Sequence, residues 1–150
     1  MGRTSHRAFA ALILVGLAVA GCGGSEHESA TAPAARTFAI KGTPFKRIAL
    51  SPSAAARIGV RTAPAARRPG AGRPGEVAVP YDAVVYDPNG VASVYTSPRP
   101  RTFIRHPVQI DHLAGSTAIL RRGPALGEAV VTVGAGELFG VETGVQGEEK

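Results

Sequence analysis

The sequence predicts a mainly β protein: a small antiparallel β-roll or barrel-like domain with one short helix, preceded by a signal peptide and a disordered stalk. Runs that alternate apolar and polar residues recur about every ten residues beyond residue 76, as in small sandwiches, rolls and barrels. The hydrophobic content is 44%, but aromatic residues make up only 5%, so we expect a core of small side chains. A chain of 150 residues suits one domain with a tail, which excludes large multidomain enzymes.

The first 21 residues are predicted to be a signal peptide. Arg3, His6 and Arg7 precede an apolar run over residues 8–20 that ends in small residues, a pattern typical of secretory leaders. As a helix this run would span about 20 Å, too little for a hydrocarbon layer of about 30 Å. Removal of the signal peptide, which contains Arg3 and Arg7, lowers the formal net charge from +6 to about +4. This mild positive charge does not indicate a nucleic-acid partner.

The segment Val19-Ala-Gly-Cys22 resembles the lipobox of bacterial lipoproteins, and Cys22 is the single Cys of the chain. The resemblance implies cleavage between Gly21 and Cys22 and a lipid thioether on the Cys22 sulfur, with palmitate-like acyl chains. A lone Cys in an exported protein has no intramolecular disulfide partner, which favours modification. Two acyl chains anchor a protein much more firmly than one. The alternative is an ordinary signal peptide with a Cys placed there by chance.

Residues 22–35 and 145–150 are predicted to be a flexible stalk and a disordered tail. The stalk is rich in Gly, Ser, Ala and Pro without apolar periodicity, so it cannot bury enough apolar surface to offset its ordering entropy. His27 lies between Glu26 and Glu28, but it has no further His, Cys or Met nearby, and we interpret it as part of a solvated tether rather than as a metal ligand.

The domain is expected over residues 36–144 and to open as strand, helix, strand. Residues 37–40 and 47–50 alternate as half-buried strands do. Ser51 can cap the following helix, Pro52 suits its first turn, and Gly59 can end it in a left-handed conformation. Residues 60–63 then resume a strand that Pro64 closes.

A Gly-, Pro- and Arg-rich loop is predicted over residues 65–75. Arg67, Arg68 and Arg73, with Arg61 nearby, form the densest positive cluster of the sequence. A solvated linker is the simpler interpretation of this cluster, and attraction to anionic lipid headgroups is the alternative.

The region after residue 76 is predicted to consist of strands. A turn at Asn89-Gly90 favours a hairpin, and the stretch over residues 102–110 fits two strands joined by a kink at Pro107. The other expected strands cover residues 76–80, 83–86, 91–96, 118–120 and 129–133.

A set of residues in this region recurs in a familiar order: Val79-Pro80, residues 83–85, Asn89-Gly90, Val94-Tyr95, Phe103, Arg105, Val108, Ile119, residues 126–128, Val130-Val131, Gly134 and Leu138. Together with residues 48–64, it resembles the membrane-proximal domain of membrane fusion proteins, the periplasmic adaptors of RND-type efflux pumps. The resemblance covers about 48–64 and 76–140, without a lipoyl or coiled-coil part. It implies a β domain that lies near the inner membrane and touches a transporter.

The sequence does not predict an enzyme, a metal site or a cofactor site. Residues 134–140 invite comparison with a dinucleotide-binding loop, but the third Gly comes one residue too late, and a turn with a short terminal helix is the simpler interpretation. His106, His112 and Asp111 could be drawn as a metal or acid/base cluster, although strand histidines on a polar face explain them more simply.

Nucleic-acid binding is not expected either, because the basic residues are scattered. Tyr81, Tyr86 and Tyr95 are interpreted as strand packing.

The predicted function is that of a lipid-anchored, exported protein-binding domain, an efflux-adaptor-like accessory at the cell membrane that faces the periplasm or the extracellular side. Its expected partners are membrane lipid, through acylated Cys22, and an inner-membrane transporter. The sequence does not specify the docking face; Asn89 and residues 99–101, which we expect on exposed hairpins, are candidate docking residues. The alternative function is a lipoprotein that carries a small ligand or a metal without a transporter partner. The transported substrate and the oligomeric state stay open.

Overall fold

Two antiparallel β-sheets and two α-helices form the described part of the chain. The computed structural model describes residues 33–67 and 76–144. The signal peptide, Cys22, most of the predicted stalk and the tail over residues 145–150 therefore lie outside the described residues, as do residues 68–75 of the predicted loop. Ten strands accompany two α-helices and one 3-10 turn, so the prediction of a mainly β domain is confirmed.

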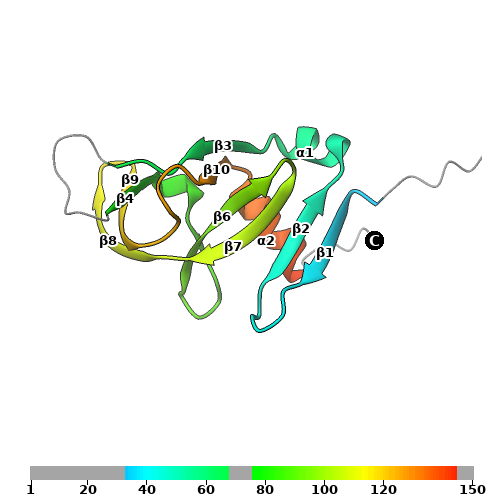
Figure 1. The fold of residues 1–150 in the computed structure, drawn as a ribbon, viewed down its shortest axis with the longest axis horizontal. Coiled ribbons are helices and arrows are strands. Elements are labelled where there is room, and N and C mark those ends of the chain that lie inside the picture. The colour runs from blue at the N-terminus through cyan, green and yellow to red at the C-terminus, as the bar shows by residue number, and fades with distance from the viewer. Residues whose placement is uncertain (1–32, 68–75, 145–150) are drawn as a thin grey trace, which may run out of the picture. The chain divides into compact units, whose positions relative to one another are not determined.

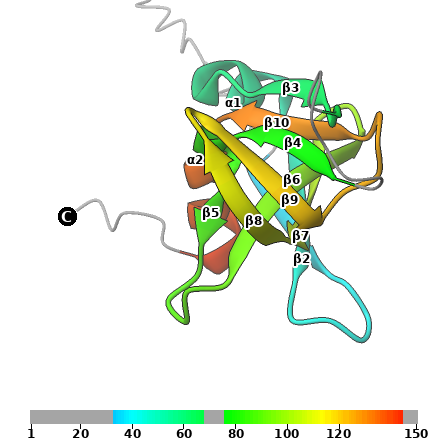
Figure 2. The same ribbon diagram turned by 90° about the vertical axis from the view of Figure 1, so that its left-hand side faces the viewer.

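The larger sheet has the strand order β1-β2-β7-β6-β10-β3, with the short β5 beside β6, and every pairing is antiparallel (Figure 1). Its strands are β1 (Ala35–Ala39), β2 (Lys46–Leu50), β3 (Arg61–Pro64), β5 (Val85–Tyr86), β6 (Ala92–Arg99), β7 (Thr102–Pro107) and β10 (Ala129–Val133). The smaller sheet has the order β4-β9-β8 and consists of β4 (Val77–Pro80), β8 (Gln109–Ala114) and β9 (Thr117–Arg122) (Figure 2).

Pro107 separates the two sheets within one continuous stretch of chain. It ends β7 in the larger sheet, Val108 follows as a buried residue, and Gln109 begins β8 in the smaller sheet. A proline has no N–H to offer a ladder, so a strand tends to stop there. The predicted pair of strands with a kink at Pro107 is confirmed.

The predicted β5–β6 hairpin is also confirmed. Gly90 adopts a φ of 80° in its turn, which is open to glycine. The Asp87 carboxylate accepts hydrogen bonds from the N–H groups of Asn89 and Val91, both at 2.9 Å. The side chain of Asp87 therefore replaces backbone partners that the turn lacks.

Helix α1 (Pro52–Ile58) begins and ends as its sequence predicts. Ser51 Oγ accepts a hydrogen bond from the Ala54 N–H at 3.1 Å. Gly59 closes the helix with a φ of 68°, and its N–H donates to the Ala55 carbonyl. These contacts satisfy groups that a helix end leaves without intrahelical partners.

Helix α2 (Ala135–Thr143) follows β10. The expected short terminal helix over residues 134–140 is confirmed and extends to Thr143, so the domain contains two α-helices rather than one. Gly134, with a φ of 90°, makes the turn into α2, and a Cβ on it would lie 2.9 Å from Ile58 Cγ2. This close approach packs the start of α2 against the end of α1.

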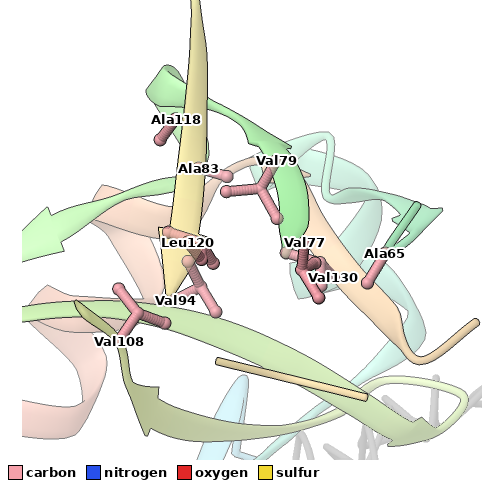
Figure 3. Packing of buried hydrophobic residues seen from close by; sticks show 9 residues of the cluster. All are labelled: Ala65, Val77, Val79, Ala83, Val94, Val108, Ala118, Leu120 and Val130. Carbon is pink, nitrogen blue, oxygen red and sulfur yellow. The ribbon is translucent and has the colours of Figure 1, made fainter. Parts of the chain in front are cut away.

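The larger sheet is buried on both faces where β6 and β10 run through its centre. Val94 and Val130 contribute to a core between the two sheets, whereas their chain neighbours Tyr95 and Val131 point to the helix side. This alternation follows from the period of two along a strand. The core between the sheets consists of small aliphatic side chains, as predicted: Ala65, Val77, Val79, Ala83, Val94, Val108, Ala118, Leu120 and Val130 (Figure 3).

Two local predictions are corrected by the structure. Ala65, expected to begin the loop, is 4% exposed, and it bonds to the turn over residues 127–128, so the paired chain continues to Ala66, which bridges to Ala78. Tyr95 is buried as expected, but Tyr81 and Tyr86 are 38% and 46% exposed, so they do not pack into the core. Their hydroxyl oxygens lie 3.4 Å apart at the surface.

Candidate functional site

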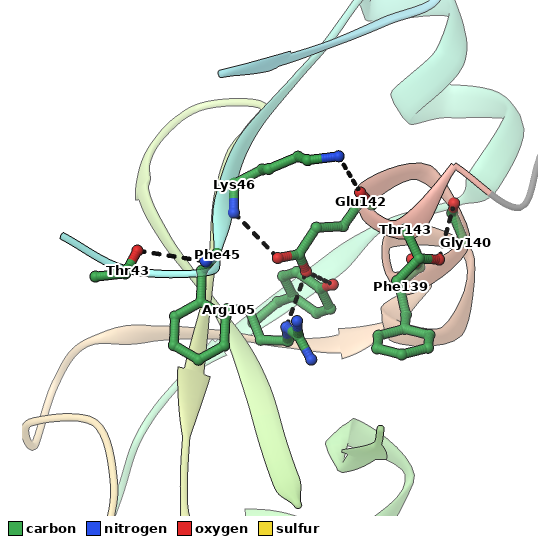
Figure 4. Close-up of polar contacts among 9 residues, drawn as sticks. Thr43, Phe45, Lys46, Arg105, Phe139, Gly140, Glu142 and Thr143 are labelled. Atoms are coloured by element: carbon green, nitrogen blue, oxygen red, sulfur yellow. Dashed lines mark hydrogen bonds and ion pairs between the residues drawn. The ribbon is translucent and has the colours of Figure 1, made fainter. Parts of the chain in front are cut away.

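A buried glutamate near the C-terminal end of α2 is the centre of the most extensive polar network in the described residues. Glu142 is 3% exposed. Its Oε1 accepts a hydrogen bond from the backbone N–H of Lys46 at 3.1 Å, and its Oε2 accepts one from the Tyr95 hydroxyl at 2.5 Å. The Arg105 Nε lies 3.0 Å from the same Oε2. We call these four residues the Glu142 network (Figure 4).

The arginine of this network is held between aromatic rings. Its guanidinium carbon lies 4.8 Å from the centroid of the Phe45 ring and 5.2 Å from that of Phe139. The Arg105 side chain is only 11% exposed, and its buried Nε–H is not aligned with an acceptor. The contact with Glu142 is therefore an ion pair without a well-directed hydrogen bond, and the aromatic faces supply further stabilisation of the cation.

Burial and the neighbouring carboxylate act together on the phenol of Tyr95. Loss of water is the larger cause and the hydrogen bond to Glu142 the next, and both raise the pKa of the Tyr95 hydroxyl far above its ordinary value near 10. The phenol therefore stays protonated and remains a donor to the carboxylate.

The Glu142 network fastens a β-ribbon to the rest of the domain. Lys46 opens β2, directly after the β1–β2 turn, and its Nζ also donates to the Glu142 carbonyl at 3.1 Å. An ammonium at the C-terminal end of a helix is favoured by the helix dipole. Since Glu142 is fully engaged in these contacts, we assign it a positioning role. It sets where the ribbon of β1 and β2 lies.

The outer edge of this ribbon carries main-chain groups that no strand of the described residues covers. The Ala34 carbonyl accepts from the Ser51 N–H, and the Ile40 N–H donates to the Phe45 carbonyl. Bonded pairs alternate along an antiparallel ladder, so the N–H and C=O groups of Ala35, Thr37 and Ala39 point away from β2. Such an edge is a template for another strand.

The histidines singled out in the sequence do not form one cluster. His112 Nδ1 lies 2.9 Å from Asp111 Oδ2, and Arg121 contacts Asp111 Oδ1 at 2.6 Å. These contacts, His112 first and Arg121 second, lower the pKa of the Asp111 carboxyl. His106 lies in the other sheet, opposite Val94. The described residues contain no group of three or more His, Cys, Asp or Glu side chains that could hold a metal ion.

The candidate docking residues lie at different places. Asn89 is in the β5–β6 turn, whereas residues 99–101 form the β6–β7 turn, where the Arg101 carbonyl accepts from the Leu50 N–H at 2.9 Å. Arg61 and Arg67 are exposed, while Arg68, Arg73, His27 and the predicted lipidation site at Gly21 and Cys22 lie outside the described residues. Sequence patterns did not identify Glu142 and Lys46 as site residues, because the two lie 96 residues apart in the chain.

An apolar groove opens beside α1. It has a volume of about 330 Å³, within the lower range of small-molecule sites. Its lining is mainly aliphatic: Pro33, Ala34, Ala35, Leu50, Ala54, Arg57, Ile58 and Val141.

Comparison with known proteins adds no identification. No protein-family model, no curated protein and no solved structure matches this chain. Within residues 33–67 and 76–144, neither helix is long and apolar enough to cross a membrane.

Proposed function

We propose that this chain is a lipid-anchored, exported domain that binds another membrane protein and serves as a transport accessory, as the resemblance to the membrane-proximal domain of membrane fusion proteins implies. The free edge of β1 is the observation that carries the protein-binding part. The outward main-chain groups of Ala35, Thr37 and Ala39 suit an extended segment of a partner, which would add a strand to the sheet. Acylated Cys22 is the proposed anchor.

The Glu142 network supports this proposal because it makes the edge rigid. A strand that adds to a preformed edge does not have to order it, so less conformational entropy is lost on binding. Lys46 lies opposite Ala39 in the β1–β2 register, and it is bound to Glu142 through both its backbone and its side chain. One end of the proposed docking edge is therefore fixed to α2.

A proline at position 37 tests strand addition. The Thr37 N–H points outward, so Thr37→Pro removes no bond of the β1–β2 ladder, but it deletes a donor and blocks a neighbouring strand. We expect the native chain to co-purify with an integral membrane transporter from detergent-solubilised membranes, Thr37→Pro to lose it, and Thr37→Ala to keep it. Equal recovery with both variants, whose melting temperatures must match, would contradict docking at this edge.

The groove beside α1 favours a second candidate function, a carrier of a small apolar ligand. Its aliphatic lining, with Leu50, Ala54 and Ile58, suits a ligand with a hydrocarbon part. Native mass spectrometry of the purified chain tests this function directly. A carrier should retain a small molecule that raises its melting temperature, and Ala54→Phe, which fills the groove, should release that molecule. A transport accessory should co-purify with a partner protein and retain no small molecule.

A further inference from the structure

One face of the β1–β2 ribbon is uncovered and basic. Paired residues of an antiparallel ladder lie on the same face, and Arg36 pairs with Ala49 while Phe38 pairs with Arg47. We call these four residues the basic face. The opposite face of the ribbon carries Ile48, which is buried in the core on the helix side.

The basic face combines cations with an exposed aromatic ring. The Arg47 guanidinium carbon lies 5.2 Å from the centroid of the Phe38 ring, and Phe38 is 41% exposed. No acidic residue occurs in β1, β2 or the adjacent β7. A hollow of about 310 Å³, lined in part by Arg36 and Ala49, opens beside them.

Two more arginines stand next to the basic face, in the β6–β7 turn. Arg99 pairs with Thr102, which is also paired with Ala49 of the basic face. Arg101 has a φ of 56°, a conformation that favours glycine. The turn therefore keeps a charged side chain at a position where the backbone alone would prefer Gly.

The positive charge of the basic face distinguishes between three occupants: a second copy of the chain, an acidic protein and an anionic lipid surface. A second copy that paired through β1 would bring Arg36 and Arg47 of both copies together, and like charges oppose this. An acidic surface is complementary instead. Ten residues lie between Cys22 and Pro33, so these two residues can be at most about 40 Å apart. A chain anchored at Cys22 thus keeps β1 close to the bilayer, which favours lipid over an acidic protein.

We propose that the basic face binds the anionic headgroups of the membrane that carries the anchor. The arginines contact the headgroup phosphates, and Phe38 lies at the level of the headgroups, as aromatic side chains do at membrane interfaces. This contact turns the ribbon toward the bilayer and presents the free β1 edge to a partner in the same membrane. The inference rests on the proposed anchor at Cys22.

The test uses residues 22–150 with Cys22→Ala, a chain that includes the compact unit Thr31–Lys150 and cannot be acylated. Its flotation is measured with phosphatidylcholine vesicles that contain either no or about one third phosphatidylglycerol. Each arginine near such a surface contributes roughly a fivefold change in affinity. Arg36→Gln/Arg47→Gln should therefore lower the partition coefficient about 10- to 30-fold, and added salt should weaken binding by the native face.

A matched double variant controls for net charge. Arg121→Gln/Arg122→Gln removes two exposed arginines from β9 of the smaller sheet and should change the partition coefficient less than about threefold. Equal losses in the two variants would overturn the assignment to the basic face. Failure to float with anionic vesicles, together with binding to polyglutamate, would overturn the lipid proposal in favour of an acidic protein. Neither result affects the anchor at Cys22, which is tested on the acylated chain.

Discussion

Replacing Glu142 with alanine removes the centre of the network that fastens the β1–β2 ribbon to α2. The substitution leaves Arg105, whose side chain is 11% exposed, without its counter-ion. It also leaves the Tyr95 hydroxyl and the Lys46 N–H without the carboxylate oxygens, Oε2 and Oε1, that accept from them. Removing one partner of a buried ion pair costs about 3–5 kcal/mol, because the remaining charge is not solvated.

This loss is large against the stability of the whole domain. A domain of this size has a free energy of unfolding of about 5–15 kcal/mol. A loss of 3–5 kcal/mol corresponds to a fall in melting temperature of about 10–20 °C. We therefore expect Glu142→Ala to fold only marginally, and Glu142→Gln, which keeps an acceptor oxygen, to lose less.

Urea unfolding followed by circular dichroism measures the effect. Glu137→Ala is the matched control, because Glu137 lies on the same helix but is exposed, and it should cost no more than about 1 kcal/mol. The double variant Glu142→Leu/Arg105→Met should lose less than the sum of its single variants, since no charge remains buried. A loss for Glu142→Ala that equals the control would refute the role of the network.

Three further predictions concern single positions. In the folded state Tyr95 keeps its proton above the pKa near 10 that it has in the unfolded chain. The free energy of unfolding should therefore fall by about 1.4 kcal/mol per pH unit above pH 10. In urea unfolding between about pH 8 and 11, Tyr95→Phe should remove this slope, and an unchanged slope would contradict the prediction. Gly134→Ala should lower the free energy of unfolding by about 1–2 kcal/mol because of the positive φ, and by about 1–3 kcal/mol more because its Cβ would approach Ile58. Gly42→Ala, with a φ of 81° but no atom within 4 Å, should show only the loss that comes from the positive φ. Arg101→Gly should raise the stability by up to about 1 kcal/mol while it weakens binding to anionic vesicles; destabilisation would show that the side chain contributes to folding.

The local structure was predictable where a single residue determines it. Ser51 and Gly59 delimit α1, Asn89-Gly90 marks a hairpin, and Pro107 ends a strand; each acts through its own backbone or side chain within a few residues. Each of these signals can be recognised from a short stretch of the sequence. They predicted nearly every element of the domain.

The candidate site was not predictable in the same way. Lys46 and Glu142 meet only because β2 and α2 pack together, and the sequence around Glu142 is typical of an exposed helix end. Likewise, the burial of Ala65 depends on pairing with residues 127–128, which no local pattern reveals. Contacts between distant segments follow from topology, and the alternation of side chains within a strand does not specify which strands become neighbours.

Lipid attachment at Cys22 is the claim on which the proposed function most depends. We would express the whole chain in a bacterial host, separate membrane and soluble fractions, and read the intact mass of the native protein beside Cys22→Ala. We expect a native chain that begins at residue 22, carries the mass of a diacylglyceryl group and sediments with membranes, while Cys22→Ala carries no lipid. A native chain that is processed elsewhere, has no lipid mass and stays in the soluble fraction would contradict it.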